Sequence, residues 1–97
     1  MNFSIIYPKD VDVIMRERRA ILIDIRTREE FQKEHWKGAM NYPEDEVEDY
    51  TRVLGKRYPI ILYCQHGGSS MQLARILGKL GYSVGTVVGG WEALKKV

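Results

Sequence analysis

The sequence predicts an α/β fold built on a parallel β-sheet, and three observations support this prediction. Short apolar runs alternate along the chain with amphipathic helical patterns. The dipeptides Asn-Gly and Asp-Gly, which join antiparallel strands in tight hairpins, do not occur. Residues 20–25 (AILIDI) form a nearly continuous apolar run, which is typical of a strand covered on both faces. We therefore expect parallel strands connected by helices.

The length and composition predict a single globular domain that spans residues 1–97. The chain has 44% apolar and 29% charged residues, and its net charge of +2 is too small to indicate nucleic acid binding. No apolar run approaches the about 20 residues of a membrane helix, and the N-terminus does not resemble a signal peptide, so we expect a cytoplasmic protein without membrane partners. The single cysteine excludes an internal disulfide and a cysteine-rich metal site. We predict no metal and no organic cofactor.

Two strands and one helix are expected within the first 25 residues. Residues 3–7 form the first strand candidate. Asp10 stands where it can cap a helix that ends near Arg19. The apolar run at residues 20–25 then supplies the second strand.

The middle of the chain predicts two helices on either side of a short strand. Thr27 and Glu30 form a capping box that opens the first helix, and Gly38 is expected to end it. Residues 39–42 offer the short strand, and the acidic run at residues 44–49 opens the second helix. These acids could repel anionic ligands or attract a basic partner, although acidic side chains also stabilise a helix N-terminus.

The last part of the chain predicts two strands and two helices. The strands are residues 59–64 and 84–88, and the final helix is residues 91–97. The helix between the strands starts at a second capping box in residues 69–72 and ends before Gly81. Its expected apolar face consists of Leu73, Ile76, Leu77 and Leu80.

The turn after residues 59–64 holds the single cysteine and is the main functional candidate. Cys64 lies at the carboxyl end of a parallel strand, where ligands collect, and directly before a helix, whose free N–H groups favour an anion. Gly67 and Gly68 allow the turn to form an anion-binding nest. A free thiol is only about 3% ionised at neutral pH, whereas lowering its pKa by about 2 units makes the thiolate the main species. We expect Cys64 to be a nucleophile; the alternative is a buried cysteine that ends a strand.

The polar neighbours of Cys64 leave several roles open. Ser69 and Ser70 can cap the helix and still face the interior of the loop. His66 could act as an acid, a base or an anion contact, or it could simply be solvated. No Asn or Asp pattern accompanies Cys64 and His66 to orient the imidazole, which argues against a Cys–His protease. The turn also has no lysine of the kind that a phosphate-binding P-loop requires.

Four segments, taken together, resemble those of a known family. They are residues 21–31 (ILIDIRTREEF), 35–43 (HWKGAMNYP), 63–70 (YCQHGGSS) and 88–91 (VGGW). In their order and residue types they resemble the rhodanese family in its single-domain form, over about residues 5–94. The resemblance implies a three-layer α/β fold with a central five-stranded parallel sheet flanked by helices.

The resemblance also implies an activity and a set of site residues. Cys64 would take a sulfane sulfur from thiosulfate or a persulfide donor, become a persulfide, and pass the sulfur to a thiol or cyanide. The implied partners are thus a small sulfur-donor anion and a thiol acceptor, or a protein persulfide donor. Asp24 and Arg26 would support the loop. The loop residues that would cradle the persulfide are Gln65, His66, Gly67, Gly68, Ser69 and Ser70. The alternatives are a persulfide carrier and a non-catalytic interaction module with the same fold.

One position departs from the pattern of many family members, which carry arginine five residues after the cysteine. Here that position is Ser69, so the loop keeps its backbone amides but has no bidentate cationic contact for an anion. Some bacterial single-domain thiosulfate sulfurtransferases also have a His-Gly-x-Ser-Ser loop, so the departure is compatible with activity. It argues against the related protein phosphatases, which need that arginine to bind phosphate.

Overall fold

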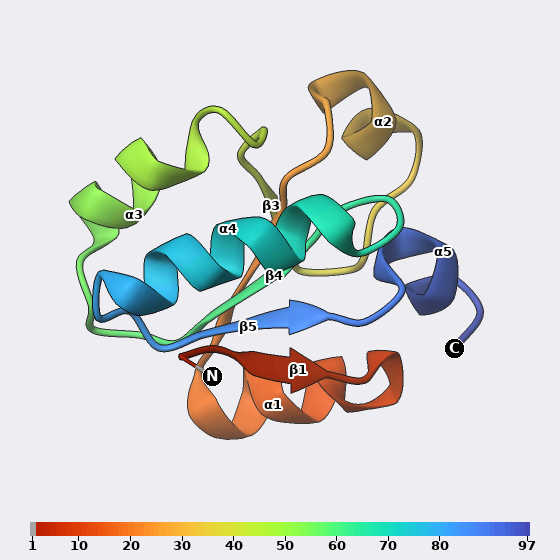
Figure 1. The fold of residues 1–97 in the computed structure, drawn as a ribbon. Helices are drawn as coiled ribbons and strands as arrows, with labels where there is room; N and C mark the ends of the chain where they lie inside the picture. The colour runs from red at the N-terminus through yellow and green to blue at the C-terminus, as the bar shows by residue number, and fades with distance from the viewer. Residues whose placement is uncertain (1) are drawn as a thin grey trace.

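The structure is a computed structural model that describes residues 2–97, and it confirms the α/β fold with a five-stranded parallel sheet (Figure 1). A short 3-10 turn, η1 (Pro8–Asp10), precedes the first helix. The other elements are β1 (Ser4–Ile6), α1 (Val11–Arg18), β2 (Ile21–Asp24), α2 (Arg28–Lys33), β3 (Met40–Asn41), α3 (Val47–Leu54), β4 (Ile60–Tyr63), α4 (Gly68–Lys79), β5 (Val84–Val87) and α5 (Gly90–Leu94).

The strand order in the sheet is β1-β5-β4-β2-β3, and every pair is parallel. β4 is the central strand: Ile60 pairs with Ile21 of β2 on one side and with Val84 of β5 on the other. All five carboxyl ends therefore lie at one edge of the sheet, and the cysteine turn follows the central strand at that edge.

Two hydrophobic clusters cover the two faces of the sheet. In β4 the side chains alternate, so that Ile60 and Leu62 join the cluster under α3 and α4, while Ile61 and Tyr63 join the cluster beside α1 and α5. Figure 1 shows α3 and α4 on one side of the sheet and α1 on the other. Because all four of these β4 side chains are buried, the strand that carries the cysteine turn is fixed from both faces.

Asp10 is the N-cap residue of α1, as predicted, but its side-chain capping bond is absent, and the predicted end of the next helix is wrong. Asp10 makes no capping hydrogen bond with its side chain, because the 3-10 turn already leads the backbone into α1 and the Asp10 N–H donates to the carbonyl of Tyr7. The helix opened by the Thr27–Glu30 capping box ends at Lys33 rather than at Gly38, and Glu34 is extended. The capping box itself is confirmed, with both of its hydrogen bonds present.

The start and the buried face of α4 also differ from the prediction. The helix begins at Gly68, two residues earlier than a box at residues 69–72 requires, and its N-cap residue is Gly67, which has no side chain to form a capping bond. The buried face is turned toward Ser70 and Ala74, while Ile76 and Leu80 are largely exposed. The earlier start brings Ser70 over the cysteine turn. No helix within residues 2–97 is long and apolar enough to cross a membrane.

Candidate functional site

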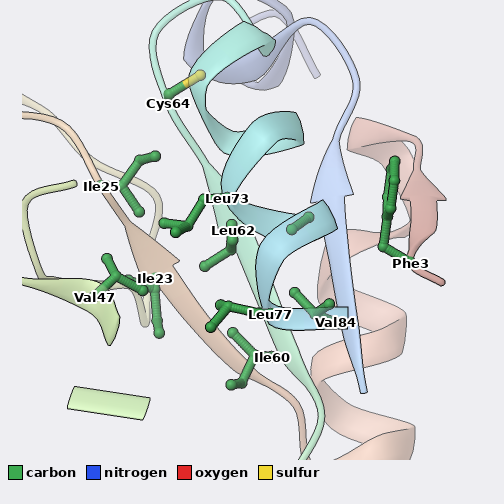
Figure 2. Packing of buried hydrophobic residues seen from close by; sticks show 11 residues of the cluster. Phe3, Ile23, Ile25, Val47, Ile60, Leu62, Cys64, Leu73, Leu77 and Val84 are labelled. Atoms are coloured by element: carbon green, nitrogen blue, oxygen red, sulfur yellow. The ribbon is translucent and has the colours of Figure 1, made fainter. Parts of the chain in front are cut away.

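The sulfur of Cys64 lies at the N-terminus of α4 and accepts hydrogen bonds from backbone N–H groups. The Gly67 N–H reaches Sγ at 3.1 Å and the Ser70 N–H reaches it at 3.3 Å. Figure 2 shows the Cys64 side chain beyond the end of β4, beside the start of α4. Only 7% of the residue is exposed. Two amides that converge on one sulfur, together with the positive end of a helix of 12 residues, stabilise negative charge on that sulfur.

Two buried hydroxyl groups, those of Ser70 and Thr86, extend the polar surroundings of the sulfur. Ser70 Oγ lies 3.4 Å from Sγ of Cys64, and Thr86 Oγ1 donates to Ser70 Oγ at 2.8 Å. Both residues are fully buried. When the sulfur is a thiolate, the Ser70 hydroxyl can donate to it while it accepts from Thr86. Thr86 was not predicted from the sequence, where its signal is a polar residue within the largely apolar strand 84–88.

The Gly89-Gly90 turn packs directly against the cysteine turn. The carbonyl oxygen of Cys64 accepts from the Trp91 N–H at 2.8 Å, and that of Gln65 accepts from the Glu92 N–H at 3.1 Å. Gly90 has φ +59°, and a Cβ at this position would lie 2.5 Å from the carbonyl oxygen of Cys64. Glycine is therefore required by both the backbone conformation and the close approach. Gly67 of the cysteine turn also lies close to Gly89, since a Cβ at Gly67 would be 3.1 Å from the Gly89 nitrogen.

Arg26 and Asp24 form a buried ion pair beside the loop. The guanidinium Nη2 lies 2.8 Å from Oδ2 of Asp24, and Nε contacts both carboxylate oxygens at 3.1 Å. Burial disfavours the charged guanidinium, but the hydrogen bonds to Asp24 and the charge of its carboxylate outweigh this effect and raise the pKa of Arg26. Arg26 is thus charged, and the carboxylate of Asp24 at the end of β2 balances its charge.

The remaining donors of Arg26 connect this ion pair to the cysteine turn. Nη1 donates to the side-chain oxygen of Gln65 at 3.2 Å, and Nη2 also donates to the carbonyl of Glu34 at 2.7 Å. The guanidinium lies 5.0 Å from the ring centre of Trp91. The amide nitrogen of Gln65 in turn donates to Glu92. Arg26 therefore links its ion pair with Asp24 to the side chain of Gln65 in the cysteine turn.

A pocket of about 640 Å³ opens over Cys64 at the carboxyl edge of the sheet. Its lining residues are Ile25, Arg26, Thr27, Glu30, Pro43, Glu44, Asp45, Cys64, Gln65 and Ser69. The structure thus brings Cys64, Gln65 and Ser69 together with Arg26, while Asp24 lies buried behind it. His66 is exposed and does not line the pocket, and Gly68 is exposed in the first turn of α4. The lining contains three acidic side chains that sequence reasoning did not assign to the site.

Comparison with known proteins shows which family this chain matches. The family model described as "Rhodanese-like domain" matches residues 7–97. A thiosulfate sulfurtransferase GlpE from Tolumonas auensis is 34% identical over 78% of this chain and 73% of its own length. A GlpE protein from Coxiella burnetii is 28% identical over 84% of this chain and 78% of its own length.

Solved structures show the same fold. A rhodanese-related protein from Thermoplasma volcanium superposes with a TM-score of 0.86 at 20% identity, covering 97% of this chain and 92% of its own. The crystal structure of reduced Bacillus anthracis CoADR-RHD matches with a TM-score of 0.85 at 29% identity, over 96% of this chain and 16% of that chain.

Proposed function

The chain belongs to the rhodanese-like domain family, and on this premise we propose that it is a sulfurtransferase with a Cys64 persulfide intermediate. The observation that supports this proposal best is the convergence of the Gly67 and Ser70 amides on the cysteine sulfur. The names of the GlpE relatives support thiosulfate as one donor.

The reaction is a pair of displacements at sulfur. The Cys64 thiolate attacks the outer sulfur of thiosulfate, the S–S bond of thiosulfate breaks, and sulfite leaves with the bonding electron pair. The product is Cys64–S–S⁻, in which the charge has moved to the new outer sulfur. A thiolate or cyanide then attacks that sulfur and restores the Cys64 thiolate. No external oxidant is consumed, because each step exchanges one sulfur–sulfur bond for another bond to the transferred sulfur.

The loop amides are suited to both halves of this cycle. The sulfur changes from an anion to a neutral bridging atom and back, so groups that tolerate both states suit the cycle. Backbone N–H groups fixed by β4 and α4 supply such stabilisation without reorganisation. Gln65 and Ser69 are the proposed contacts to the donor, and their position in the lining of the pocket beside Cys64 supports this. His66, Gly68 and Ser70 complete the proposed loop.

Incubation with thiosulfate, followed by intact-mass measurement, tests the proposal. We expect the protein to gain the mass of one sulfur atom and to lose it when cyanide is added. Cys64→Ser should gain nothing, whereas His66→Ala should still be loaded, because His66 is exposed outside the pocket and only its backbone belongs to the proposed loop. A protein that stays unloaded with both thiosulfate and persulfide donors would be an interaction module rather than an enzyme.

A further inference from the structure

Three carboxylates lie at the pocket above Cys64: Glu30, Glu44 and Asp45, which we call the acidic rim. Glu30 comes from the first turn of α2, while Glu44 and Asp45 follow β3. The Glu44 N–H donates to the carbonyl of Ile25 at 3.0 Å, so the backbone of this segment is attached to the end of β2, next to the cysteine turn. The acidic rim therefore has a defined place in the fold.

The charge of the acidic rim is not neutralised locally. None of its three carboxylates forms an ion pair with another residue of the described range 2–97. Arg26 is the one cation among the described lining residues, and it is already engaged by Asp24. The neighbouring Arg28 is paired with Glu46 at 2.7 Å. The pocket thus presents uncompensated negative charge to an incoming donor.

This charge is unfavourable for thiosulfate, which carries two negative charges and would meet no free cation among the lining residues that the structure describes. The arginine that could bind such an anion is replaced by Ser69 at this position of the loop. At separations within a Debye length, about 10 Å at 0.1 M salt, several like charges raise the free energy of an approaching anion and lower that of a cation.

We propose that the acidic rim makes Cys64 selective for sulfur donors that carry a positive charge beside the sulfane sulfur. Such a donor is a persulfide, R–S–SH, in which R is a small ammonium compound or a lysine- or arginine-rich protein segment. The Cys64 thiolate attacks the outer sulfur, the S–S bond of the donor breaks, R–S⁻ leaves, and Cys64–S–SH forms. This inference rests on the proposed function and specifies its substrate class.

Two small donors of similar size and opposite charge provide the test. The rate constant for sulfur loading is measured by intact mass with the persulfides of cysteamine and of 3-mercaptopropionate, and their ratio is formed for each protein. The rim variant is Glu44→Gln/Asp45→Asn, which leaves Glu30 in its capping box. The control variant is Glu17→Gln/Glu48→Gln, which changes the net charge equally at exposed, unpaired positions away from the pocket.

We expect the rim variant to lower the cysteamine-to-mercaptopropionate ratio by about threefold to tenfold, and the control variant to leave it unchanged. The rim variant should also load faster with thiosulfate, and added salt should reduce the difference from the wild type. Equal ratios in the wild type and the rim variant would overturn the acidic rim as a selectivity element. Failure of the wild type to load from any donor would instead overturn the proposed function.

A further comparison identifies the source of the positive charge. A cysteine-persulfide peptide flanked by lysines is compared with the cysteamine persulfide in the same assay. Faster loading by the peptide identifies a basic protein segment as the donor, and equal loading identifies a small ammonium persulfide. A glutamate-flanked peptide that loads as fast as the lysine-flanked one would contradict the proposal.

Discussion

At the scale of single residues, the site depends on what surrounds one sulfur atom. Cys64 is buried, and its sulfur is approached by two backbone amides and one hydroxyl. The sequence indicated the cysteine, the glycines and the helix that follows, because these residues are adjacent in the chain. It could not reveal Thr86, which reaches Ser70 only after β5 has paired with β4.

The hydroxyl pair gives a prediction at this scale. Thr86→Val should slow sulfur loading by about fivefold, the effect of one hydrogen bond worth about 1 kcal/mol, because the Ser70 hydroxyl loses the donor that orients it. The rate is obtained by stopping loading reactions at a series of times and measuring the intact mass of the protein in each sample. Thr51→Val is a matched control, since Thr51 is equally buried but bonds to a carbonyl in α3. Equal rates in the two variants would show that Thr86 has no such role.

Tyr63 gives a second prediction, on the pH dependence of stability. Burial raises the pKa of Tyr63 above its usual value near 10, and its hydroxyl accepts a hydrogen bond from the Trp36 N–H at 3.1 Å. The folded protein therefore holds this proton more tightly than the unfolded chain, so stability is retained below pH 10 and falls as the pH rises further.

A comparison of Tyr63→Phe with the wild type tests this predicted loss of stability at high pH. At pH 8 the variant should be about 1 kcal/mol less stable, because the Trp36 N–H has lost its acceptor. Between pH 10 and pH 12 the wild type should lose stability more steeply than the variant, so the gap should close. Urea unfolding at a series of pH values measures both effects. Parallel curves above pH 10 would contradict the assignment.

At the scale of elements, the turn before α5 supports the cysteine turn. Gly90→Ala should lower the free energy of unfolding by about 1–3 kcal/mol, because alanine is strained at φ +59° and its Cβ would collide with the Cys64 carbonyl. Gly55→Ala is the control: φ is +77° there, but no atom lies within 4 Å of the added Cβ. Chemical unfolding gives the stabilities.

The loading rate of the folded fraction then separates strain from contact. Both variants should be destabilised, but Gly90→Ala alone should load sulfur slowly, because it displaces the carbonyl that anchors the loop to Trp91. If Gly90→Ala loads at the rate of Gly55→Ala, the packing of the two turns does not affect the site.

The elements themselves were largely predictable, and their ends less so. Strands and helices follow from the spacing of apolar residues, which is a local property. Asp10 is the N-cap residue of α1 but makes no side-chain capping bond, because a 3-10 turn can lead into a helix without one. The error at the start of α4 arose because Gly67, at φ +106°, can end the turn before any serine is reached. The buried face of α4 therefore includes Ser70 and Ala74 instead of Ile76 and Leu80.

At the scale of the whole molecule, the two hydrophobic clusters share one sheet, and β4 contributes side chains to both. The strand order β1-β5-β4-β2-β3 could not be read from the sequence, since pairing depends on contacts between distant segments. The same holds for the connection from Asp24 through Arg26 and Gln65 to Glu92, which joins three regions of the chain.

The shared sheet predicts that residues 1–97 unfold as a single domain. Far-ultraviolet circular dichroism, which reports on helices and strands, and tryptophan fluorescence, which reports on Trp36 and Trp91, should give coincident urea transitions. Both tryptophans pack in the cluster beside α1 and α5. Helix α4, which contributes to the circular dichroism signal, packs on the opposite face of the sheet. Separate transitions would show that the two faces unfold independently.

The central claim is that Cys64 carries the transferred sulfur and that backbone amides hold it. A crystal structure of the sulfur-loaded protein tests both parts at once. We predict one additional sulfur bonded to Sγ of Cys64, with hydrogen bonds from N–H groups of residues 65–70 and none from a lysine or arginine side chain. An unmodified Cys64 in protein that has gained one sulfur atom, or an outer sulfur bound to a cationic side chain, would contradict the account.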